Sequence, residues 1–113
     1  LSAHGDVKRE ITSTGMPLGL FPDQRYESVS MPNLQSGDVL ALITDGISES
    51  STRDDVEFGS HGALKVIRRH IHEPAARIVS HVYRAAREFC GGPQVDDMTA
   101  VVCRVGECGP RPL

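Results

Sequence analysis

The stretch that decides the fold is VLALITDGISE, residues 39–49. Its first five residues are apolar without alternation, a pattern that predicts a strand covered on both faces. Asp45 and Gly46 then end the strand, which places a carboxylate at the rim of the sheet where glycine permits a sharp turn. Glu49 follows four residues after Asp45, close enough for a second acid to fold back toward the first. Taken alone, the stretch also fits an Asp-Gly turn in a solvated hairpin.

A second acidic cluster, VDDMT at residues 95–99, precedes the β-rich run AVVCRV at residues 100–105. Two unit negative charges about 5 Å apart repel by roughly 3 kcal/mol at an effective dielectric near 20, so such clusters converge only around something cationic. Oxygen ligands of this kind suit Mg²⁺ or Mn²⁺, whereas zinc more often brings histidine or cysteine. The alternative for this motif alone is that Asp96 or Asp97 is a helix-capping or turn residue.

Composition limits the class of protein. A chain of 113 residues with 39% hydrophobic residues can bury one core, so it is one domain or part of one. The net charge of -3 with both signs interspersed gives no basic stripe for nucleic acid, and no apolar run is long enough to span a bilayer. Three cysteines without CxxC or zinc-type spacing indicate reduced thiols and a cytoplasmic protein. Because the chain begins at Leu1 without a signal-peptide pattern, we expect it to be a piece of a longer protein.

Two amphipathic helices are predicted between the acidic clusters. The first starts near Ser60, and the second starts at Pro74 and ends at the Gly91-Gly92-Pro93 stop signal. Their apolar stripes comprise Leu64, Ile67 and Ile71 in the first helix and Ala75, Ile78, Val79, Val82, Ala85, Ala86 and Phe89 in the second. The signals before the central strand are weaker: a hairpin within residues 1–12, a buried turn at residues 14–21 and a strand at residues 26–31.

Histidine and serine chemistry is not favoured by the pattern. His70 and His72 are two residues apart, so on a helix they point away from one another and cannot share a metal. Surface histidines are therefore expected. Ser48, Ser50 and Ser51 lack a histidine and an aspartate in any recognisable arrangement. The chemistry that the sequence offers is the pair of acidic motifs.

Five short motifs occur in an order and spacing that resemble the metal-dependent protein phosphatases (PPM family), above all its bacterial SpoIIE-type branch. They are GMPLGL at 15–20, Gly37-Asp38, TDGISE at 44–49, Phe58-Gly59 and DDMTAVV at 96–102. The resemblance implies an α+β fold, in which two stacked antiparallel sheets are flanked by helices in an αββα sandwich. It further implies that residues 1–105 are the C-terminal part of such a domain and that residues 106–113 are a flexible tail.

The resemblance also implies a site. The family holds a binuclear Mn²⁺ or Mg²⁺ centre at one rim of the sandwich, and Asp45 matches a metal ligand from its Asp-Gly motif. Asp96 matches the partner ligand, Asp97 would support it, and Glu49 matches an acid that in some members helps to bind a further, weaker metal. Metal-activated water would then hydrolyse phosphoserine or phosphothreonine, and no side-chain nucleophile is required.

One departure from the family pattern leaves two readings open. The family carries another metal-bridging aspartate, followed by glycine, in the first half of its domain, and nothing in these residues corresponds to it. The chain is then either a catalytically incomplete fragment of a phosphatase or a degenerate docking module. For the phosphatase, the resemblance implies a small phosphoprotein substrate, often an anti-sigma-factor antagonist, and a sensor domain upstream. An Asp-Gly or Gly-Asp motif about half a domain earlier would favour the enzyme.

Overall fold

The computed structural model describes residues 1–31, 33–52, 54, 56–91 and 97–106. The elements in these ranges are β1 (Val39–Ile43), α1 (Asp45–Ser48), α2 (Gly59–Arg69), α3 (Ala75–Cys90) and β2 (Ala100–Arg104). The predicted α+β class is confirmed, and the two expected helices are α2 and α3. Among the described helices, none combines the length and apolar character that crossing a bilayer requires.

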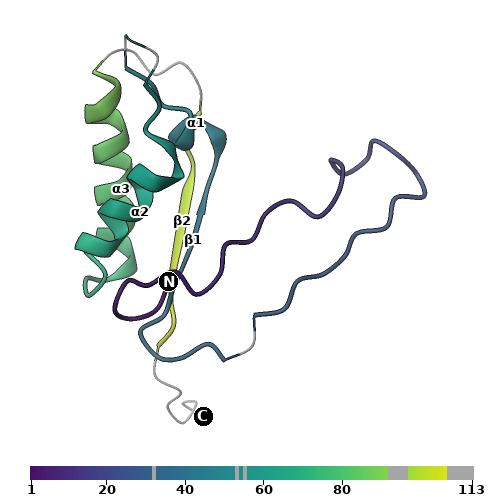
Figure 1. Cartoon of the computed structure of the whole chain (residues 1–113), viewed down its shortest axis with the longest axis horizontal. Helices are drawn as coiled ribbons and strands as arrows, with labels where there is room; N and C mark the ends of the chain where they lie inside the picture. The colour runs from purple at the N-terminus through teal and green to yellow at the C-terminus, as the bar shows by residue number, and fades with distance from the viewer. Residues whose placement is uncertain (32, 53, 55, 92–96, 107–113) are drawn as a thin grey trace.

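The sheet consists of β1 and β2, which lie side by side in antiparallel register (Figure 1). Val39 is opposite Arg104 at one end, and Ile43 is opposite Ala100 at the other. Leu1 extends the pairing at the start of β1, where its carbonyl accepts a hydrogen bond from the Val39 amide at 2.9 Å and its amino group donates to the Val39 carbonyl at 2.7 Å. At the same end of the sheet, the Val105 amide donates to the Asp38 carbonyl at 2.8 Å.

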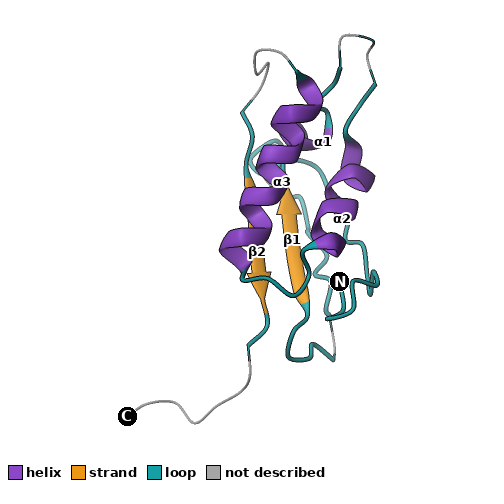
Figure 2. Cartoon of the chain, turned by 90° about the vertical axis from the view of Figure 1, so that its left-hand side faces the viewer, coloured by secondary structure: helices purple, strands orange, loops and turns teal. Residues whose placement is uncertain are grey.

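Helices α2 and α3 cover one face of this sheet (Figure 2). The predicted apolar stripe of α3 is confirmed, since Ile78, Val82 and Ala86, four residues apart, are completely buried. The buried core consists of Val39, Ile47, Ala63, Ile67, Ile71, Ile78, Val82 and Ala86. Each large member stabilises the fold by about 1.5–3 kcal/mol relative to an exposed position. Gly91 ends α3 in the left-handed conformation with φ of 59°, as predicted, while Gly92 and Pro93 lie outside the described residues.

The opposite face of the sheet is bare, and the prediction that the central strand is covered on both faces was wrong for the described chain. Leu40 is 49% exposed, Leu42 53% and Val101 49%. Cys103, which is opposite Leu40 in the register, is also exposed. The reason is that successive residues of a strand point to opposite faces, and the two helices pack on one of them.

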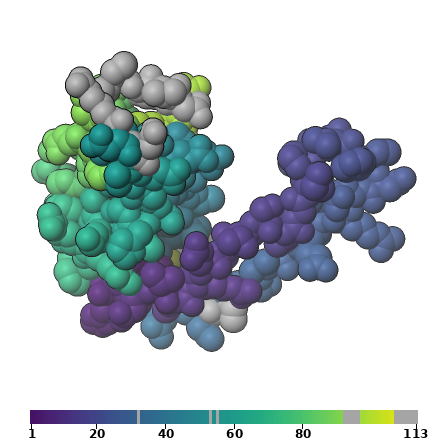
Figure 3. All heavy atoms as spheres, turned by 45° about the horizontal axis from the view of Figure 1, so that its top comes forward, coloured from purple at the N-terminus to yellow at the C-terminus, as the bar shows by residue number. Residues whose placement is uncertain are grey.

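Residues 7–31 and 33–35 form an extended arm that leaves the body and returns to it (Figures 1 and 3). The predicted hairpin in residues 1–12 and the strand at 26–31 were wrong, because these residues form no regular strand. The predicted buried turn at 14–21 is exposed throughout, with Leu18 84% exposed. The radius of gyration is 16.4 Å, against about 13 Å for a compact domain of this length, and the arm contributes to this difference.

Asp38 anchors the base of this arm. Its side chain is buried, accepts a hydrogen bond from Lys8 Nζ at 2.5 Å and a second from the Gln35 amide at 2.9 Å. The hydrogen bond from Lys8, followed by that from Gln35, lowers the pKa of the Asp38 carboxyl below its ordinary value. Gly37 precedes it with φ of 87°, and its amide donates to the Val105 carbonyl at 2.8 Å. The Gly-Asp pair thus joins the arm to both strands.

Candidate metal centre at the rim of the sheet

Asp45 lies at the rim where β1 ends. Thr44 is extended, with φ of -88° and ψ of 166°, and Asp45 is the first residue of the short helix α1. Ile47, two residues further on, is completely buried and holds α1 against the core. Asp45 remains exposed as a result, so its carboxylate faces solvent at the predicted place.

The two acidic motifs are held together by Thr44 and Thr99. The Thr44 amide donates to the Thr99 carbonyl at 3.0 Å, and the Thr44 hydroxyl lies 3.2 Å from the same oxygen. In return, the Thr99 amide donates to Thr44 Oγ1 at 3.0 Å. The Thr44 hydroxyl can take part in both of its contacts, because a hydroxyl group donates and accepts hydrogen bonds. The Thr44–Thr99 pair continues the β1–β2 pairing by one residue beyond Ile43 and Ala100.

Gly46 brings the motifs into direct contact. A Cβ atom built on Gly46 would lie 1.9 Å from the carbonyl oxygen of Asp97 and 2.7 Å from its carbonyl carbon. Such distances are shorter than any van der Waals contact, so only glycine fits here. The backbone after Asp45 and the backbone of Asp97 therefore touch, although they are separated by some fifty residues of sequence. The Asp97 side chain is exposed, and Asp96 lies outside the described residues.

Glu49 closes α1 one helical turn after Asp45. Its amide donates to the Asp45 carbonyl at 2.7 Å, and its side chain is exposed. Behind it, the buried Ser50 donates its hydroxyl to the Gly46 carbonyl at 2.7 Å. This bond ties the turn that carries Asp45 to the loop that leads into α2.

The donors at the rim are of the type that a hard divalent cation prefers, but the described part of the chain does not gather three of their carboxylates. Among the described residues, only His70, Glu73 and His81 have three such ligand atoms within 4.8 Å of one another. Asp45, Glu49 and Asp97 offer carboxylate oxygens, and the Thr44–Thr99 pair keeps the two strand ends at a fixed separation. Oxygen ligands of this kind suit Mg²⁺ or Mn²⁺. The role of each rim carboxylate as a metal ligand stays a prediction.

A surface hollow lies next to the rim, between α3 and the start of β2. Its volume is about 330 Å³. The residues that line it are Val79, Ser80, Tyr83, Met98, Thr99 and Ala100. Thr99 thus borders both the hollow and the contact between the acidic motifs.

Comparison with protein families extends these observations. The model described as Stage II sporulation protein E (SpoIIE) matches residues 1–106. The chain belongs to the SpoIIE family. SpoIIE domains are associated with phosphatase function and are in general metal-dependent. No curated protein and no solved structure matched the chain.

The SpoIIE-type motifs predicted Asp45, Asp96, Asp97 and Glu49 as site residues, and these roles stay predictions; two features of the rim were not predicted. The reciprocal Thr44–Thr99 bonds were not predicted, although a threonine stands at the rim end of each strand. The close approach of Gly46 to Asp97 was not predicted either, because a glycine that permits a turn looks the same in sequence as a glycine that admits a neighbouring backbone.

Proposed function

We propose that the chain is the C-terminal, metal-binding part of a SpoIIE-type serine/threonine protein phosphatase that depends on Mn²⁺ or Mg²⁺. Its substrate would be phosphoserine or phosphothreonine on a small regulatory phosphoprotein, such as an anti-sigma-factor antagonist. The proposal rests on family membership and on one observation above all: Gly46 and Asp97 are in backbone contact, so both acidic motifs belong to one rim.

Each rim residue has a distinct part in this proposal. Asp45 and Asp96 would bind metal, Asp97 would orient the Asp96 segment, and Glu49 would help to hold a further, weaker ion. When bound, the ions supply electrophilic activation of water and of the phosphoryl oxygens. Thr44 and Thr99 keep the two motifs at a constant separation through their hydrogen bonds. The hollow beside Thr99 would accept the peptide that flanks the phosphorylated residue.

We further propose that this chain alone is close to inert. A binuclear centre requires ligands that hold two ions at a defined separation, and small errors in that geometry cost large factors in rate. The rim carboxylates of the chain would hold one ion at most, and loosely. A bridging carboxylate from elsewhere in the parent protein would have to complete the pair.

Phosphate release tests the proposal. We would measure turnover of an aryl phosphate and of a phosphoserine protein with millimolar Mn²⁺, for this chain and for a version extended upstream. The chain should bind Mn²⁺ but release no phosphate above background, whereas the extended version should be active. Asp45→Ala should abolish activity in the extended version and weaken Mn²⁺ binding in both. Asp54→Ala, which removes an exposed acid from the loop before α2, is the matched control and should change neither.

Two outcomes would contradict the proposal in different ways. Strong turnover by the short chain that is lost in Asp45→Ala would show that its metal centre is complete. Absence of turnover by both versions, together with retained binding of a phosphoprotein, would favour the degenerate docking module.

A further inference from the structure

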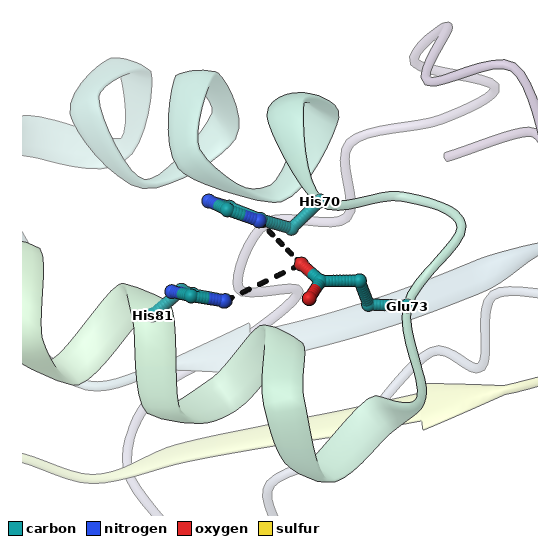
Figure 4. A group of neighbouring side chains, drawn as sticks. All are labelled: His70, Glu73 and His81. Carbon is teal, nitrogen blue, oxygen red and sulfur yellow. Dashed lines mark hydrogen bonds and ion pairs between the residues drawn. The ribbon is translucent and has the colours of Figure 1, made fainter.

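Three side chains meet at the junction of α2 and α3 (Figure 4). His70 follows the last residue of α2, Glu73 lies in the turn, and His81 lies on α3. His70 Nδ1 and His81 Nε2 both contact the same carboxylate oxygen of Glu73, the second at 3.3 Å. One ligand atom from each residue lies within 4.8 Å of the others. We refer to these residues as the His–Glu–His cluster.

We propose that the His–Glu–His cluster is a second metal site, for Zn²⁺ or a similar borderline divalent cation. Two imidazole nitrogens and one carboxylate oxygen are a donor set that binds zinc and leaves a fourth position for water. The side chains of His70, Glu73 and His81 are 25%, 38% and 26% exposed, so an ion can reach them from solvent. The rim, in contrast, offers oxygen donors that suit Mn²⁺ or Mg²⁺.

The backbone that carries the cluster is fixed from two sides. Arg104, at the end of β2, donates from Nη1 to the carbonyls of His72 and Glu73, both at 2.9 Å. His81 lies on α3 between the completely buried Ile78 and Val82, so its backbone is held by the core. The ligands therefore need no large rearrangement to meet an ion, which reduces the entropic cost of binding.

One local movement is required. The rings of His70 and His81 are stacked, with centroids 3.6 Å apart and planes inclined by 11°. Nitrogen lone pairs lie in the plane of the ring, so the two lone pairs run nearly parallel and do not converge on one point. An ion would be shared after one ring rotates about its Cβ–Cγ bond, a torsion with broad minima in histidine. Metal binding should therefore separate the stacked rings.

The cluster is remote from the rim. Arg104, which holds the turn of the cluster, is opposite Val39, whereas the rim follows Ile43 and Ala100. Four residue steps along a strand correspond to about 13 Å. The prediction that His70 and His72 point apart assumed that both lie on a helix, but α2 ends at Arg69 and both lie in the turn that follows. The sequence pattern missed His81, because the cluster joins this turn to α3.

Zinc titration tests the proposal on the whole chain. We would measure Zn²⁺ binding by calorimetry in the presence of a reductant, and the visible absorption of Co²⁺ as a spectroscopic substitute. His81→Ala and Glu73→Gln should each raise the Kd for Zn²⁺ by at least about tenfold, because each removes a ligand. His72→Ala is the matched control, since it removes an exposed histidine from the same turn, and it should leave the Kd within about twofold.

Asp45→Ala separates this site from the rim, because it should leave Zn²⁺ affinity unchanged even if the proposed phosphatase function fails. The His ring signals in NMR spectra should also shift on Zn²⁺ addition for His70 and His81 and not for His72. Absence of Zn²⁺ binding by the unaltered chain, or equal affinity in all variants, would overturn the proposal. So would an equal loss in His72→Ala. If His81→Ala loses helicity by circular dichroism, the Zn²⁺ affinity of Glu73→Gln tests the proposal instead, since glutamine keeps the shape of the side chain.

Discussion

Gly46 lies where the turn after β1 meets the backbone of Asp97, and at this position steric space matters rather than backbone conformation. The glycines with positive φ are found elsewhere, at Gly37 and Gly91 among others, so an alanine at position 46 would meet no dihedral penalty. It would instead place Cβ 1.9 Å from the Asp97 carbonyl oxygen, which belongs to backbone and has little freedom to move.

Gly46→Ala should therefore destabilise the fold by about 1–3 kcal/mol, the range for overpacking, even though alanine favours a helix. It should also weaken Mn²⁺ binding, because the two acidic motifs would be pushed apart. Denaturant melts and a Mn²⁺ titration measure the two effects. Gly106→Ala is the control, because its added Cβ meets nothing within 4 Å among the described residues, and it should stay within about 0.5 kcal/mol. A Gly46→Ala protein with unaltered stability and Mn²⁺ affinity would disprove the close approach.

At the scale of elements, α3 is the part that attaches the helical layer to the sheet. Its stripe of Ile78, Val82 and Ala86 is buried against the core, and Ile67 and Ile71 contribute to the same core from α2 and the turn that follows it. The aromatic rings of Phe58, just before α2, and Phe89, near the end of α3, have centroids 5.5 Å apart. They lie at the end of the helix pair that is away from the α2–α3 turn. Spacing of apolar residues predicts such a stripe well, because helical periodicity is local.

Val82→Ala should lower the free energy of unfolding by about 1–3 kcal/mol, less than the largest core truncations because valine loses fewer atoms than leucine. Urea unfolding followed by circular dichroism gives the value. Val56→Ala makes the same chemical change at a side chain that is 56% exposed, and it should cost less than about 0.5 kcal/mol. Equal effects of the two substitutions would mean that the α3 stripe does not carry the packing.

At the scale of the whole molecule, the helices cover one face of the sheet, and the other face is exposed to solvent. Leu40, Leu42 and Val101 form an apolar patch on the bare face, and the arm of residues 7–31 and 33–35 adds further exposed apolar side chains. Apolar surface gathered in this way promotes association, because its burial removes area from water.

The isolated chain should therefore self-associate as its concentration rises, and Leu42→Lys should reduce this by placing a charge in the centre of the patch. Sedimentation velocity over a range of concentrations measures the change. Val56→Lys alters a comparably exposed apolar residue away from the sheet, and it should leave the association unchanged. A monomer at all concentrations, or an equal effect of both substitutions, would contradict this prediction.

The sequence by itself determined the helical stripes, the class of the fold, the family and the two acidic motifs, because these depend on local periodicity or on short motifs in order. Residues 14–21 show where local pattern fails, since their apolar character predicts burial and all of them are exposed. Only the tertiary structure decided that one face of the sheet is covered, that Gly46 meets Asp97 and that His81 joins His70 and Glu73. The physical reason is that each of these depends on contact between segments far apart in the chain, and such contacts follow from how the layers pack.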